Sequence, residues 1–154
     1  MRKTTLLDLV VPFAVIGVTA YVLLRFSYGS IPPVSVAAPL PLAVLGVAEL
    51  IIARRVRAVV RHDPRARPMT AIAVARCVAL GKASSLVGAG LGGAAVGLLA
   101  RVAPDAGSVR AASSDTRAGA FLLAASVVVV IGGMALERAG IDPNRRDRTP
   151  RGGG

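Results

Sequence analysis

The sequence predicts an all-α fold: an integral membrane four-helix bundle built from two antiparallel helical hairpins. Hydrophobic residues make up 54% of the 154 residues, a share that a soluble domain of this size would rarely carry on its surface. Four uncharged apolar runs each approach the ~20 residues that a helix needs to cross about 30 Å of hydrocarbon. These runs are continuous and do not alternate, so helices explain them better than the strands of a membrane barrel.

The first predicted span covers residues 6–25 and follows Arg2 and Lys3. A basic start before an apolar run is also typical of a cleaved signal peptide. Bulky residues follow the only plausible small-residue cleavage site, near Ala20, and the chain then enters a second apolar run. We therefore expect the first helix to be retained.

The second and third spans are predicted at residues 39–57 and 76–101, on either side of an arginine-rich turn. Pro39 suits the opening turn of the second helix, because proline lacks the N–H that would be unpaired there. The third helix resumes near Met69, and a continuous helix from there to Arg101 would be ~50 Å long, well beyond the thickness of a bilayer. Its first turns must therefore protrude or tilt.

The fourth span is predicted at residues 117–137, and serines and an acid just before it are placed to cap the helix. Together the four spans form one transmembrane domain over residues 1–138. The remaining segment, residues 139–154, is basic and has little apolar content to bury. We expect this cytoplasmic tail to be disordered.

The distribution of charge predicts the orientation. Thirteen of the nineteen cations precede the first span, lie between the second and third spans, or follow the fourth. Four lie on the opposite side of the predicted membrane. Because positive residues accumulate on the cytoplasmic face, we expect both termini and the middle loop inside, in a multi-pass protein of the plasma membrane.

The formal net charge of +11 invites a nucleic-acid hypothesis. Against it, the arginines flank membrane spans, and no aromatic platform or recognition helix accompanies them. The predicted partners are instead the lipid bilayer and its anionic lipid headgroups at the cytoplasmic face. A second copy of the chain or another membrane protein is a further candidate partner.

Three charged residues around the second and third spans could pair within the membrane: Glu49, Arg76 and Lys82. Counted from the centre of the turn between the second and third helices, Glu49 and Lys82 are at similar depth. An ion pair between them would hold the two helices in register and would avoid the cost of an unpaired charge in the membrane. Pairing with Arg76, separate snorkelling toward headgroups, and a protonatable Glu49 in a transport path are the alternatives.

Small residues mark one face of the third span. At 100° per residue, four of them fall within a narrow sector: Gly81, Ser85, Gly88 and Gly92. Gly93 and Gly97 repeat the same four-residue spacing. Because such spacing lets a neighbouring helix approach closely, this face is predicted to be a packing surface, either within the chain or against a second copy.

No catalytic, cofactor-binding or metal-ligating set is predicted. His62, the only histidine, lies beside a proline turn and is expected to be solvated. Ser84 and Ser85 have no base within helical reach. The single cysteine, Cys77, excludes an intrachain disulfide. The sequence therefore indicates neither an enzyme nor a cofactor.

A family resemblance rests on three stretches, Ala73 to Arg76, Lys82 to Ser84 and Arg110 to Thr116, together with the glycine-rich third span and Glu137 at the end of the fourth. With these residues the chain resembles the small four-helix membrane proteins of unknown function found in actinobacteria, which tend to be encoded near folate-biosynthesis enzymes. The resemblance covers roughly residues 1–138. It implies an architecture and no mechanism.

The sequence leaves two functional hypotheses. The first is a non-enzymatic, multi-pass inner-membrane protein that acts as a structural or accessory component of the cell envelope. The second is a small proton-coupled or oligomeric transporter that uses Glu49. Few polar groups lie within the predicted spans, which favours the first hypothesis, because cargo sites need several such groups.

Overall fold

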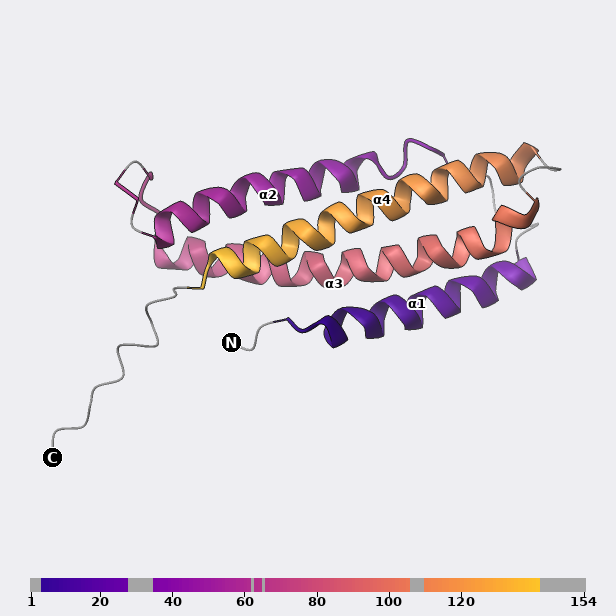
Figure 1. Ribbon diagram of the computed structural model, residues 1–154, viewed down its shortest axis with the longest axis horizontal. Coiled ribbons are helices and arrows are strands. Elements are labelled where there is room, and N and C mark those ends of the chain that lie inside the picture. The colour runs from indigo at the N-terminus through magenta and orange to yellow at the C-terminus, as the bar shows by residue number, and fades with distance from the viewer. Residues whose placement is uncertain (1–3, 28–34, 62, 65, 106–109, 142–154) are drawn as a thin grey trace, which may run out of the picture.

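The computed structural model describes residues 4–27, 35–61, 63–64, 66–105 and 110–141, arranged as Figure 1 shows. These residues form four long helices, α1 (Leu6–Ser27), α2 (Leu40–Val60), α3 (Ala71–Val102) and α4 (Arg110–Ala139), with a short 3-10 turn, η2 (Ala103–Asp105), after α3. The prediction of an all-α four-helix bundle is confirmed. Beyond Ile141, the tail that was predicted to be disordered lies outside the described residues.

Local chemistry explains where two of the helices begin. The Thr70 side chain accepts a hydrogen bond of 3.2 Å from the Ala73 N–H and so caps α3. Pro39 and Pro41 lie at the start of α2, where the missing N–H groups leave no donor unpaired. α3 then continues without a break for 32 residues, which at 1.5 Å per residue is ~48 Å. It is therefore longer than the apolar run inside it.

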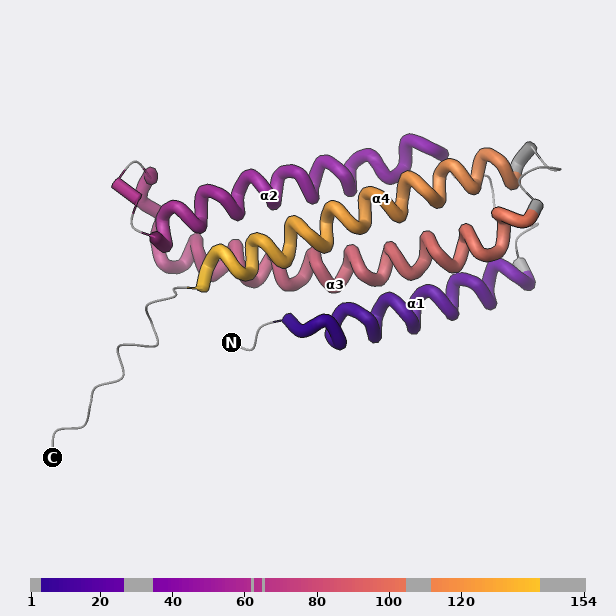
Figure 2. The backbone as a smooth tube through the Cα atoms, viewed as in Figure 1, coloured from indigo at the N-terminus to yellow at the C-terminus, as the bar shows by residue number. Residues whose placement is uncertain are grey.

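α3 and α4 form the centre of the bundle as an antiparallel hairpin (Figure 1). α1 packs on α3, with Gly17 against Gly93 and Tyr21 against Gly97. Because the residue numbers rise together along the two helices, α1 and α3 are parallel. The tube through the Cα atoms shows them running in the same direction (Figure 2).

α2 packs on the other side of the hairpin, against α4, and is parallel to it, with Gly46 against Val129 and Glu49 against Gly132. α1 and α2 lie at opposite edges and do not touch within the described residues. The predicted arrangement of two antiparallel hairpins is therefore wrong for α1 and α2, which are not neighbours.

The positions of the glycines explain which helices become neighbours. α3 carries glycines on two faces: Gly81 and Gly88 meet α4, while Gly93 and Gly97 meet α1. The single glycine of α2, Gly46, faces α4. Between membrane helices there is no hydrophobic driving force, so close backbone approach decides which helices associate. Adjacency in the sequence is therefore a poor guide here.

The apolar runs of α1, α3 and α4 overlap in depth. Asp8 of α1 is near Lys82 of α3, and Gly81 of α3 meets Glu137 of α4. From this level the uncharged runs of α3 and α4, residues 83–100 and 118–136, extend in the same direction along the bundle. The α1 run, residues 9–24, overlaps them but starts ~9 Å further along, because Phe13 packs against Gly93. The α3 run defines an apolar layer of ~27 Å, close to the ~30 Å of bilayer hydrocarbon. We call the end of the bundle beyond Lys82, where α2 and α4 end, the basic end.

Three described helices are long and apolar enough to cross a membrane, within Leu6–Phe26, Ala71–Val102 and Ala112–Ala139. α2 is not among them, since an acid and three arginines fall in its 21 residues. It is also shifted toward the basic end, because its later turns pack beside Leu136 and Ala139 at the end of α4. The structure thus has three candidate spans where the sequence predicted four.

Candidate functional site

Glu49 lies where α2, α3 and α4 meet, and only 1% of its surface is exposed. α4 admits this side chain because residue 132 is glycine. A Cβ at Gly132 would lie 3.1 Å from both the Cβ and the Oε2 of Glu49. On the α3 side, the Ser84 hydroxyl comes close to the carboxylate. Three helices therefore enclose an acid just inside the apolar layer.

Neither carboxylate oxygen of Glu49 has a hydrogen-bond partner among the residues that the structure describes. Ser84 approaches them without reaching hydrogen-bond geometry. An uncompensated buried charge costs about 3–5 kcal/mol. Glu49 is thus held by the packing of three helices and not by an ion pair.

The structure does not form the ion pair of Glu49 with Lys82 or with Arg76 that the sequence suggested. Lys82 is exposed and lies near Asp8 of α1, and Arg76 is exposed further along α3 toward the basic end. The physical reason is rotational. Ser84, which faces Glu49, is two residues from Lys82, so the two side chains point about 160° apart around α3. Glu49 and Lys82 therefore lie at similar depth but on different sides of α3.

The predicted packing face of α3 is buried and lies mainly against α4. All four of its members are buried: Gly81, Ser85, Gly88 and Gly92. The contact is tightest at Gly81, where a Cβ would lie 2.6 Å from the Gly133 carbonyl oxygen. At Gly92 it loosens, because a Cβ would be 3.6 Å from the nearest atoms, those of Phe13 and Ser126. The partner of this face lies within the same chain.

A second close-packed face of α3 turns toward α1. A Cβ at Gly97 would lie 2.5 Å from the Gly17 carbonyl oxygen, and one at Gly93 would collide with the Phe13 carbonyl. Gly90 belongs to the same face and meets the Ile16 side chain. The spacing of Gly93 and Gly97 was a visible signal for this contact, whereas nothing in the sequence singled out Gly90.

On α4, two adjacent glycines contact two different helices. A Cβ at Gly132 would lie 2.7 Å from the Gly46 carbonyl oxygen of α2, and a Cβ at Gly133 would lie 2.5 Å from the Gly81 carbonyl oxygen of α3. Successive residues of a helix point 100° apart, so the pair opens both sides of α4 at one level. This level is also that of Glu49.

Backbone donors of the N-terminal segment engage two further acids at the basic end. Glu137 of α4 accepts a hydrogen bond of 2.7 Å from the Thr4 N–H. Asp8 accepts one of 2.8 Å from the Thr5 N–H, which caps the start of α1. The first of these bonds ties the segment before α1 to the end of α4.

The remaining candidate groups do not gather into a reactive cluster. Within the described part of the chain, no three His, Cys, Asp or Glu residues lie together in a way that could hold a metal ion. Cys77 is a free, half-buried cysteine that packs beside the apolar cluster of α2 and α4. His62 lies outside the described residues.

Fold and contacts together define a class: a helical membrane protein with several candidate spans, whose helices associate through glycine-lined contacts. The chain belongs to a family described as "Protein of unknown function (DUF3180)", which it matches over residues 9–143. No curated protein and no solved structure matches it.

The two glycines Gly81 and Gly92 provide a matched test of the close contact between α3 and α4. Both lie inside α3, so replacing either with alanine brings the same gain in helix propensity, about 1 kcal/mol. At Gly92 the added Cβ makes ordinary contacts, whereas at Gly81 it strikes backbone. In thermal unfolding in mild detergent, we expect Gly92→Ala to hold or raise the midpoint and Gly81→Ala to lower it. Equal shifts would contradict a contact centred on Gly81.

A second test concerns Glu49. Replacing a buried unpaired acid with an apolar residue of similar length removes a desolvated charge, so Glu49→Met is expected to keep or raise the unfolding midpoint. Lys82→Met is expected to act independently, with a coupling free energy below about 0.5 kcal/mol in the double-mutant cycle. A large loss in Glu49→Met that Lys82→Met restores would mean that the two residues pair after all.

Proposed function

We propose that this chain is a non-enzymatic, multi-pass protein of the plasma membrane that acts as a structural or accessory component of the cell envelope. The observation that carries the proposal is the backbone contact of α4 with both α2 and α3, at Gly132 and Gly133. Helices that touch through their backbones have few side chains between them that can rearrange. Such a bundle suits a fixed platform better than a moving carrier.

The proposed orientation places both termini and the turn between α2 and α3 in the cytoplasm. α2 and α4 end at one end of the bundle, and α1 runs away from that end, starting part-way along α3 (Figure 1). That end carries the exposed arginines of the second half of α2: Arg54, Arg55 and Arg57. Positive residues favour the cytoplasmic side, and this clustering supports the proposed orientation.

Reporter fusions test this orientation. Reporters fused after residue 30 and after residue 110 are expected to read outside, and those at residue 64 and at the C-terminus are expected to read inside, because the cations concentrate around the latter two positions. Each position is tested with two reporters, one active only outside the cytoplasm and one active only inside it, so that each serves as the control for the other. An outside signal at residue 64 would contradict the proposal.

A second candidate function is a small proton-coupled or oligomeric transporter that uses Glu49. The specific observation in its favour is the full burial of an acid whose oxygens have no hydrogen-bond partner in the described part of the chain. Intramembrane acids with this property are found in proton relays. Against it, Glu49 lines neither of two apolar hollows in the described surface.

Proton flux into sealed vesicles separates the two functions. Vesicles that contain the purified chain are expected to acidify no faster than empty vesicles under an imposed pH gradient, and Glu49→Gln is expected to behave like the wild type. A flux above background that Glu49→Gln abolishes would support the transporter and overturn the structural role. The unfolding midpoint of both proteins serves as the control for a folded bundle.

A further inference from the structure

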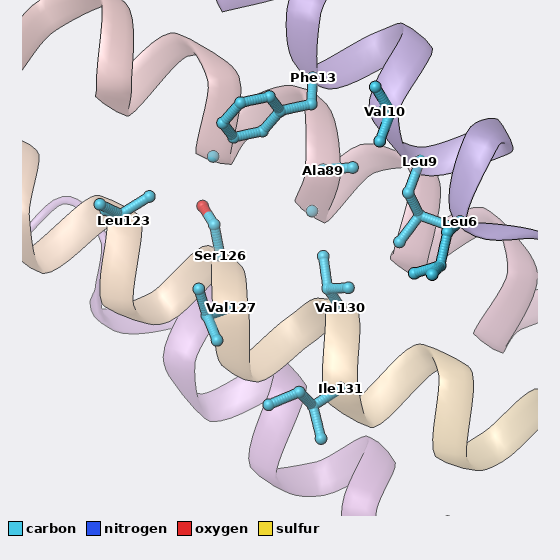
Figure 3. Close-up of a pocket in the computed structure, with 12 residues that line it drawn as sticks. Leu6, Leu9, Val10, Phe13, Ala89, Leu123, Ser126, Val127, Val130 and Ile131 are labelled. Atoms are coloured by element: carbon cyan, nitrogen blue, oxygen red, sulfur yellow. The ribbon is translucent and has the colours of Figure 1, made fainter.

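A groove runs along α3 between α1 and α4. α1 packs on α3 and does not contact α4 within the described helices, so a hollow of about 240 Å³ remains between them. Figure 3 shows Leu9 and Phe13 of α1 on one side, and Val127 and Val130 of α4 on the other. Ala89 and the glycines beside it form the floor. The walls are apolar, and the one hydroxyl in the lining, that of Ser126, donates to the Leu122 carbonyl oxygen.

The hollow continues toward the far end of the bundle. A second apolar hollow, of about 260 Å³, lies between α1 and α3 and shares Phe13 with the first. Its floor includes Val96, one heptad after Ala89 on α3. Residues seven apart point within about 20° of each other on a helix. The two hollows therefore follow one line along α3, inside the apolar layer.

Two exposed cations stand where this line leaves the apolar layer. Lys82 is seven residues before Ala89 on α3, and Arg138 is seven residues after Ile131, which lines the groove on α4. By the same heptad geometry each cation points to the groove side of its helix. The proximity of Lys82 to Asp8 of α1 agrees with this placement.

The acids at this level already have hydrogen-bond donors. Asp8 accepts the Thr5 N–H, and Glu137 accepts the Thr4 N–H. Beyond them the exposed arginines of α2, together with Arg76, add positive charge at the basic end. Such a field attracts the anionic lipids of a membrane surface.

We propose that this groove is a binding site for one anionic phospholipid, with an acyl chain along α3 and its phosphate between Lys82 and Arg138. The inference rests on the proposed insertion of the bundle in a membrane. The groove lies at the depth of the acyl chains, and its mouth is at the depth of the headgroups. A transmembrane helix of a partner or of a second copy could pack against the apolar walls, but its apolar surface would offer no anionic group to the two cations at the mouth.

The headgroup contact is tested on the full-length chain in mild detergent by native mass spectrometry. Phosphatidylglycerol is the probe, and phosphatidylcholine with the same acyl chains is the comparison. The wild type is expected to retain one phosphatidylglycerol molecule, more tightly than phosphatidylcholine. Lys82→Gln and Arg138→Gln are each expected to weaken that binding about fivefold, as the loss of one cation at an anionic surface implies.

Arg76→Gln is the matched control, because it removes a cation from the same helix. Arg76 is six residues from Lys82 and points about 120° away from it, so its replacement is expected to leave binding unchanged. Equal losses in all three variants would show general attraction to the basic end and would overturn the site.

The acyl-chain contact has its own pair of variants on α1. Val10 lines the groove, so Val10→Phe is expected to obstruct it and to reduce retention of both lipids. Val15 is 60% exposed and lines neither hollow, so Val15→Phe is expected to retain them. Unchanged lipid binding in Val10→Phe would overturn the proposal. So would a lipid-free dimer that Val10→Phe dissociates, since that result assigns the groove to a second copy.

Extraction of membranes with alkaline carbonate separates this inference from the proposed function. A chain that resists extraction but binds neither lipid refutes the lipid site alone. A chain that carbonate releases refutes membrane insertion, and the lipid site with it. Equal unfolding midpoints of the variants and the wild type show that lost binding is not lost folding.

Discussion

The close approach of α3 and α4 at Gly81 and Gly133 is the contact on which the other helices depend. A Cβ on either glycine would strike the carbonyl oxygen of the other, at 2.6 and 2.5 Å. Between helices in a bilayer, van der Waals contact drives association, whereas in water the hydrophobic effect does so. Backbones this close give many such contacts, and the hairpin they hold offers one free face to α1 and another to α2.

The placement of α2 follows from the residue beside this contact. Because Gly132 opens the neighbouring face of α4, α2 can bring Gly46 and Glu49 against it. The acid is then enclosed on the side of α3 that carries Ser84, away from Lys82. Lys82 instead belongs to the side on which α1 packs. Because α1 packs on α3 and does not contact α4, an apolar groove remains between these two helices, over α3.

Much of the fold was predictable because its signals are local. The apolar runs predict the helices within a few residues at most ends, and the four small residues of the face that includes Gly88 fall into one sector of α3. The contact of Gly90 with Ile16 could not be predicted, since a lone glycine does not reveal its neighbour. The proposed pair of Glu49 and Lys82 failed for a similar reason: depth can be counted along a chain, but rotation requires knowledge of which helix lies on which side.

By itself the sequence determined the helical class, the four uncharged apolar runs, the clustering of cations and the glycine stripes, because each depends on residues close together in the chain. Only the tertiary structure decided that α1 is parallel to α3, that α2 is parallel to α4 and is displaced toward the basic end, and that Glu49 is enclosed without an ion pair. The physical reason is that connections of about ten residues can reach either neighbour. The choice therefore falls to the faces on which the backbones can come closest.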